Sequence, residues 1–235
     1  MNNSRNNSGR ILRAMLLGAA ALVATLPACN IVTPASYIIN GPGKVDAEYT
    51  LADKKTVVFV DDPDNILDKV ATRVALADAV GFDLMDREIL TSTVKAADAI
   101  AVARTGGNGG AGGKLMSVEA IGRAVDCAQV IHIQPTIFDL VGRSDTQGLR
   151  PTAIVFVKVI DIESKKVLYP LPDVLPDGRE ITATIRETDS DLLRSRTGRA
   201  QVSDQLVKKL AVEVGQLFYE HDRLDLGENL GTRRR

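Results

Sequence analysis

The stretch AIVFVKVID, from Ala153 to Asp161, decides the fold class. Side chains alternate between the two faces of a strand, so Val155, Val157 and Val159 would line one face. The residues between them are also mostly apolar. A strand that is apolar on both faces is typical of the middle of a sheet. The stretch therefore predicts a central strand of an α/β protein.

Further strands and helices are predicted on both sides of this strand. Runs rich in β-branched residues indicate strands, and apolar residues at every third or fourth position indicate helices. Asp64 or Asn65 would cap the first helix, Gly81 would end it, and Ser203 lies near the cap of the last helix. The predicted strands are 56–60, 129–133, 137–141, 153–161, 167–169 and 181–185, and the predicted helices are 66–80, 94–104, 118–125 and 203–218. This order predicts a single α/β domain with a mixed sheet and helices packed on it.

The amino terminus has the pattern of an export signal. Arg5, Arg10 and Arg13 precede a run of small and apolar residues from Ala14 to Leu26, and Pro27 ends that run. A basic segment followed by a short apolar one is typical of a secretory signal, and the run is too short to span a bilayer. We therefore expect residues 1–28 to be removed on export.

The end of this signal resembles the bacterial lipobox. The residues Leu26-Pro27-Ala28-Cys29 place a thiol directly after a small residue. The resemblance implies cleavage before Cys29 and attachment of fatty acyl chains, such as palmitate, to that residue. Two or more acyl chains anchor a protein stably in a membrane. By the enterobacterial sorting rule, Asn30 favours the outer membrane over the inner one. The alternative is an ordinary secretory signal that is cut nearby.

The remaining chain divides into three parts. Residues 29–52 contain Pro and Gly without lasting periodicity, which predicts a lipidated tether facing the periplasm. Residues 53–222 are predicted to form the α/β domain, and residues 223–235 a flexible tail. The formal net charge of −1 argues against nucleic-acid binding, because that function requires a basic surface. With Cys29 lipidated, Cys127 has no partner for an intrachain disulfide and is expected to be a buried apolar residue.

Three features suggest sites, and we favour a structural interpretation for each. The pattern Gly107-x-Gly109-x-x-Gly112 within Gly106–Gly113 matches the dinucleotide fingerprint, but it lacks the preceding strand and the later acidic residue. A solvated loop is the expectation there, with neither cofactor nor small-molecule substrate. The sequence contains no Gly-x-Ser-x-Gly nucleophile elbow whose serine His132 or His221 could activate. We therefore expect both histidines to be core or surface residues.

Three carboxylates follow the first strand, where α/β enzymes often place a nucleophile or a magnesium ligand. Asp62 and Asp64 are similar to the start of a haloacid-dehalogenase-type phosphatase motif, with Asp61 beside them. The supporting lysine and the late acidic pair of that motif are not found in a convincing context. Helix capping is therefore expected, and neither a catalytic residue nor a metal ligand is assigned.

The order of elements resembles a superfamily of bacterial envelope lipoproteins. Val57–Val60, Ile121–Val130 and Val155–Ser164, with the closing helix, look similar to the group that includes the curli secretion channel subunit, the TolB amino-terminal domain and the penicillin-binding-protein activators. The match departs at Val125-Asp126-Cys127-Ala128, which lacks the glycine of that group. The likeness implies an α/β domain that docks onto envelope proteins, and no catalytic residues carry over.

The sequence thus predicts a non-catalytic, membrane-anchored lipoprotein that binds a protein partner or assists assembly. Two alternatives stay open: a ring-forming secretion-channel subunit, and a phosphatase-like or metal-binding enzyme that uses Asp62 and Asp64. A channel subunit would need long membrane-crossing hairpin strands, and only the short stretch after Pro176 could serve. A binding module therefore ranks above a pore.

Overall fold

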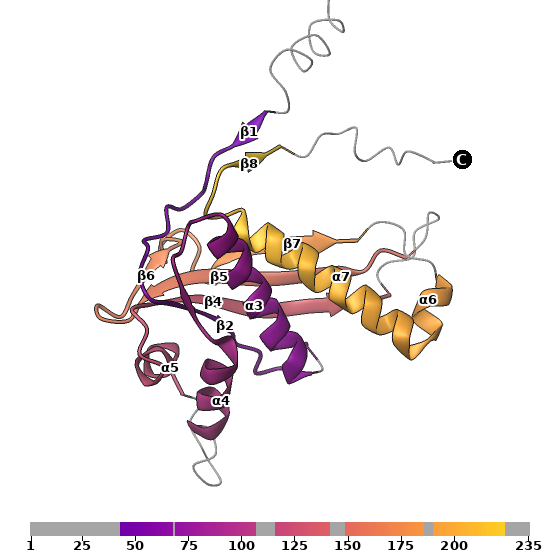
Figure 1. Ribbon diagram of the computed structural model, residues 1–235, viewed down its shortest axis with the longest axis horizontal. Helices are drawn as coiled ribbons and strands as arrows, with labels where there is room; N and C mark the ends of the chain where they lie inside the picture. The colour runs from indigo at the N-terminus through magenta and orange to yellow at the C-terminus, as the bar shows by residue number, and fades with distance from the viewer. Residues whose placement is uncertain (1–42, 68, 107–115, 142–148, 186–189, 224–235) are drawn as a thin grey trace, which may run out of the picture. The chain divides into compact units, whose positions relative to one another are not determined.

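A mixed β-sheet forms the centre of the computed structural model (Figure 1). The structure describes residues 43–67, 69–106, 116–141, 149–185 and 190–223. Asp46–His221 forms one compact unit. In this unit, helices pack against the mixed sheet, which confirms the fold class predicted from the periodicity.

The sheet has the strand order β3-β2-β4-β5-β6, and β7 also pairs with β5. The strands are β2 Thr56–Val60, β3 Thr93–Val94, β4 Gln129–Asp139, β5 Thr152–Asp161, β6 Lys166–Tyr169 and β7 Arg179–Thr184. β2 runs parallel to β3 and β4, and β5 runs antiparallel to β4, β6 and β7. β5 therefore has neighbours on both sides, which confirms that it is central.

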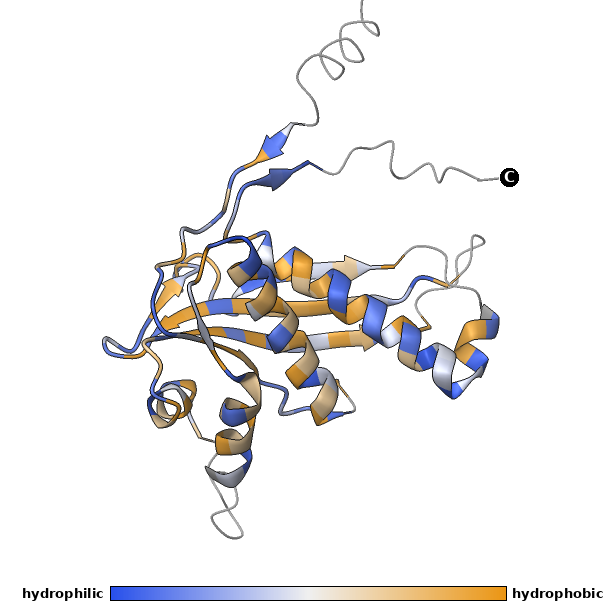
Figure 2. Cartoon of the chain, in the orientation of Figure 1, coloured by the Kyte–Doolittle hydropathy of each residue, from blue (hydrophilic) through white to orange (hydrophobic). Residues whose placement is uncertain are grey.

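The helices lie on both faces of the sheet. They are α3 Val70–Asp86, α4 Ala96–Gly106, α5 Val118–Ala124, α6 Ser190–Arg194 and α7 Arg196–Gly215. α3 and α7 pack against each other and cover the first face, where α3 contacts β2, and α7 contacts β5 and β7. α4 and α5 lie on the second face, where α4 contacts β2 and α5 contacts β4. Figure 2 shows the hydrophobic residues concentrated along β4 and β5.

Two hydrophobic cores hold these layers together. The larger core joins the first face of the sheet to α3 and α7, and it contains Val58, Val157 and Leu210. The smaller core joins β2 and the start of β4 to α4 and α5, and it contains Val57, Phe59 and Ile121. Because successive strand residues point to opposite faces, β2 contributes to both cores and is fully buried.

The first helix begins and ends later than predicted. Neither Asp64 nor Asn65 caps it, because the chain first makes a turn in which Asn65 has a φ of 55°. The helix then starts after Lys69, which makes no side-chain cap. Gly81 lies inside the helix, buried beside Thr93 of β3, and does not end it. The helix ends at Asp86 and Glu88 follows with a φ of 59°.

Further boundaries differ from the predictions. The helix predicted over 94–104 begins only at Ala96, because Val94 belongs to β3, which pairs with β2. The runs 129–133 and 137–141 were predicted as separate strands, but they belong to β4, which continues through a bulge between Pro135 and Ile137. The last helix begins at Arg196, and its cap is Ser195 and not Ser203. The Ser195 Oγ accepts a hydrogen bond from the Gly198 backbone N–H at 2.9 Å. Ser117 caps α5, which agrees with the predicted helix 118–125, and a tight turn joins β5 to the antiparallel β6.

A second, smaller unit contains the described residues 43–45 and 222–223. The strands β1 Lys44–Val45 and β8 His221–Asp222 form a two-stranded sheet. His221 therefore belongs to a strand and not to the end of a helix. Among the helices in the described part of the chain, none has the length and apolar character needed to cross a membrane.

Candidate protein-binding surface

The second face of the sheet is only partly covered. α4 and α5 pack on β2 and on β4, and in the described residues no helix packs on β5 or β7 from this side. The sequence predicts that β5 is apolar on both faces, which the structure confirms, but only the first face of β5 is covered by helices. On the second face, Ile160 is buried, whereas Ile154 and Phe156 are half-buried and partly meet solvent.

The strand register places these side chains next to one another. Gln134 of β4, Phe156 of β5 and Glu180 of β7 form one row across the sheet, and Ile137, Ile154 and Thr182 form the next. We call these six residues the open face. Ile137 is 44% exposed, Ile154 and Phe156 are half-buried, and all three lie outside both hydrophobic cores.

The open face has the composition of a protein-binding surface. Its centre is apolar, and its rim carries the amide of Gln134, the carboxylate of Glu180 and the hydroxyl of Thr182. An exposed apolar patch with a polar rim is a common mark of a protein interaction site. One feature of the sequence indicates that this face of β5 is exposed: Lys158 interrupts its apolar residues.

A hydrogen-bonded histidine–aspartate pair borders the open face. His132 of β4 is 8% exposed, and its Nε2 lies 3.1 Å from Oδ2 of Asp61, which follows β2 directly. The ring of Phe59 lies beside it, with the centroids 6.2 Å apart. No serine, threonine or cysteine of the described residues hydrogen-bonds to His132. The couple therefore joins β2 to β4 and shows no nucleophile that a histidine could activate.

Asp62 is turned into the protein and holds the turn after β2. Its side chain is fully buried, and its carboxylate accepts hydrogen bonds from the backbone N–H groups of Ile66 at 2.7 Å and Leu67 at 2.9 Å. Nε of Arg73 lies 3.0 Å from Oδ2 of Asp62, as an ion pair without the geometry of a hydrogen bond. Asp64 is exposed. The predicted capping role is thus taken by Asp62, for a turn and not for the helix.

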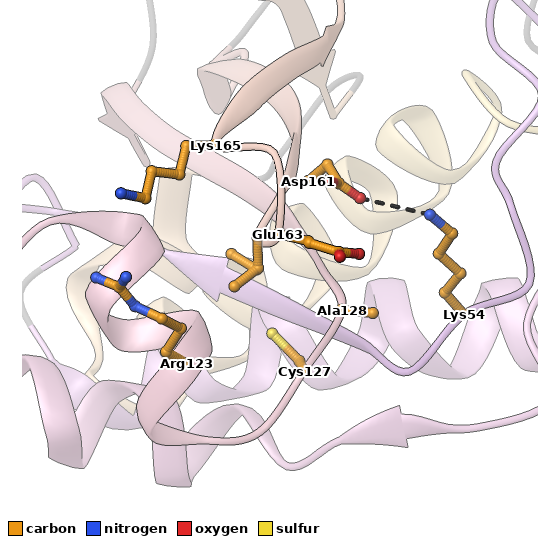
Figure 3. Close-up of a pocket in the computed structure, with 8 residues that line it drawn as sticks. Lys54, Arg123, Cys127, Ala128, Asp161, Glu163 and Lys165 are labelled. Atoms are coloured by element: carbon orange, nitrogen blue, oxygen red, sulfur yellow. Dashed lines mark hydrogen bonds and ion pairs between the residues drawn. The ribbon is translucent and has the colours of Figure 1, made fainter.

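Cys127 lines a surface pocket of about 470 Å³, beside α5 and the turn that follows β5 (Figure 3). The pocket is lined by Lys54, Arg123, Cys127, Ala128, Asp161, Ile162, Glu163 and Lys165. Lys54 pairs with Asp161 at 3.4 Å, and Asp161 also accepts hydrogen bonds from Ser164. The cysteine is buried and free, as the sequence predicts, and burial raises the pKa of its thiol to about 11.

This pKa predicts an unreactive thiol. At pH 8 a group with a pKa of about 11 is almost entirely protonated, and only the thiolate attacks alkylating reagents. In the Cys29→Ser chain Cys127 is the only thiol, so its alkylation by iodoacetamide can be timed directly. We expect the native protein to react at least about 100-fold more slowly than the denatured chain. Equal rates would contradict the buried placement.

Other predicted features lie outside the described residues. Cys29 and the fingerprint Gly107-x-Gly109-x-x-Gly112 are among them, whereas Gly106 is the last residue of α4. Within the described ranges, no group of three or more His, Cys, Asp or Glu side chains is placed to hold a metal ion. The expected roles of the signal, the tether and the loop therefore stay predictions.

Comparison with known proteins identifies no family. No family model matches the chain, and no curated protein matches it. The chain is similar to several solved structures at low identity. A hypothetical protein from Chlamydia trachomatis has 13% identity and a TM-score of 0.40, and the match covers 69% of this chain and 96% of that one.

Two other solved structures have comparable values. A PelC dodecamer from Paraburkholderia phytofirmans has 13% identity and a TM-score of 0.37, with coverage of 75% of this chain and 97% of that one. A lipoprotein from Neisseria meningitidis has 14% identity and a TM-score of 0.35, with coverage of 64% and 96%. A likeness at this level assigns neither a family nor a function. The resemblance to the superfamily of curli and TolB domains therefore stays a prediction.

Proposed function

We propose that this protein is a lipoprotein of the bacterial envelope, anchored through Cys29, whose α/β domain binds a protein partner through the open face and has no catalytic role. The observation that carries the proposal is the apolar centre of that face, formed by Ile137, Ile154 and Phe156. Without a covering helix, these side chains leave apolar surface in water that a partner could bury.

The state of the candidate catalytic groups supports a binding role over the phosphatase alternative. A phosphatase nucleophile must reach its substrate, but the Asp62 carboxylate is fully buried and already accepts two backbone hydrogen bonds. His132 is also buried, and its ring pairs with Asp61. These side chains are committed to holding the sheet and the turn after β2.

Site-specific photo-crosslinking in the native cells tests the proposal. A photoreactive phenylalanine analogue placed at Phe156 or Ile137 should form an adduct with a distinct protein, because both positions lie on the open face. The matched control is Phe82 of α3, an aromatic side chain that is 65% exposed but lies on another surface. Adducts from Phe82 as abundant as those from Phe156, or none from either open-face position, would refute the assignment.

A further inference from the structure

Within the described residues, the backbone hydrogen-bonding groups at the outer edge of β7 are unpaired. The N–H of Ile185 bonds to the carbonyl of Pro151 at 2.9 Å, which fixes the phase of the β5–β7 ladder. Hydrogen-bonded pairs alternate with non-bonded ones in an antiparallel pair. The N–H and C=O groups of Glu180, Thr182 and Thr184 therefore point away from β5, toward the outer edge.

Nothing in the described part of the chain covers this edge. β6 pairs with residues 159–161 of β5, and β7 pairs with residues 152–157 of β5. The two strands therefore lie end to end along the same edge of β5, and β6 does not pair with the outer edge of β7. The backbones of Glu180, Thr182 and Thr184 have no further partner in the described segments. Natural edge strands are usually shortened, bulged or charged to prevent pairing, and this one is six residues long with a single charge, on Glu180, among the three outward residues.

The sequence of β7 is complementary to itself in one antiparallel register. If Thr182 lies opposite Thr182 of a second copy, then Glu180 lies opposite Thr184 in both directions. All three outward residues of each strand would then be hydrogen-bonded across the new interface. No like charges oppose each other, and Ile181 lies opposite Ala183 on the first face. Cross-strand hydroxyl pairs and apolar pairs each stabilise such a contact.

From this self-complementarity we infer that two copies of the chain pair through β7, antiparallel and centred on Thr182. Opposed residues of an antiparallel pair point to the same side of the sheet, so the two open faces become one continuous surface. This assembly is separate from the binding of another protein to the open face. Either can exist without the other.

A disulfide at the proposed symmetry axis tests the register. Opposed hydrogen-bonded residues have Cα atoms about 5.5 Å apart, which is within the range of a disulfide. The full-length chain with Thr182→Cys, oxidised in its own membranes, should run as a covalent dimer on a non-reducing gel. Thr184→Cys is the matched control, because its Cα would lie roughly 14 Å from its own copy, beyond disulfide range. Cys127 is buried and does not compete.

Two further variants make the test independent of one disulfide. Combining Glu180→Cys with Thr184→Cys should restore covalent dimers, because these residues oppose each other in the proposed register. Thr182→Lys places two like charges at the axis and should halve the mass of the detergent-extracted protein, while an unchanged circular dichroism spectrum shows that the separated copies stay folded. Dimers from Thr184→Cys alone, adducts of Thr182→Cys with another protein only, or a monomeric wild type would each overturn the inference. The adduct pattern at Phe156 would be unaffected in all three cases.

Discussion

Replacing Asp62 with Ala is expected to lower the free energy of unfolding by about 4 kcal/mol. The substitution removes the acceptor of two backbone hydrogen bonds and leaves the Arg73 guanidinium largely buried without its counter-charge. Asp62→Asn keeps one acceptor oxygen but loses the charge, so we expect a loss of about 2 kcal/mol. If Asp62 only capped a helix, as the sequence predicts, Asp62→Asn would lower the free energy of unfolding by at most about 1 kcal/mol.

Chemical denaturation of the variants measures this difference directly. Asp64→Ala is the matched control, because Asp64 is exposed in the same turn and should change the free energy of unfolding by less than about 0.5 kcal/mol. Addition of magnesium should leave the melting temperature of the wild type unchanged, since a ligand stabilises only a state that binds it. Equal losses for Asp62→Ala and Asp64→Ala would show that Asp62 does not hold the turn.

Changing Cys29 to Ser is expected to move the protein from the membrane fraction to the soluble fraction. The thiol is the proposed acylation site, and acyl chains supply the stable membrane affinity that the tether lacks. Fractionation after a high-salt wash measures the effect. Cys127→Ala is the control, because it removes the other cysteine of the chain and should leave the protein on the membrane. A Cys29→Ser protein that stays on the washed membranes would contradict lipid anchoring.

Hydrophobic periodicity predicted the central part of the fold well. The strands at 56–60 and 153–161 and the short helix after Ser117 follow from patterns of apolar residues and a capping hydroxyl, both of which act locally. The predictions failed where distant contacts decide the backbone. Gly81 would end an isolated helix, but inside the domain it is a buried position of α3 beside Thr93, and the helix continues through it.

The candidate surface could be predicted only in part. The apolar character of Ile154 and Phe156 is visible in the sequence, but whether a helix covers them depends on where α4 and α5 pack. Likewise, Asp62 and Asp64 look equivalent in the sequence, and only the fold buries the first beside Arg73 while it exposes the second. The pairing of His132 with Asp61 arises from the parallel alignment of β2 and β4, which no local pattern specifies.

The affinity for the partner crosslinked at the open face tests the central claim most directly. Once that partner is purified, its binding to the detergent-extracted protein can be compared by calorimetry between the wild type, Phe156→Glu and Phe82→Glu. A charge in the apolar centre of an interface should weaken binding by at least about tenfold, whereas the same change on α3 should not alter it. Equal affinities of the Phe156→Glu protein and the wild type would contradict a binding role for the open face.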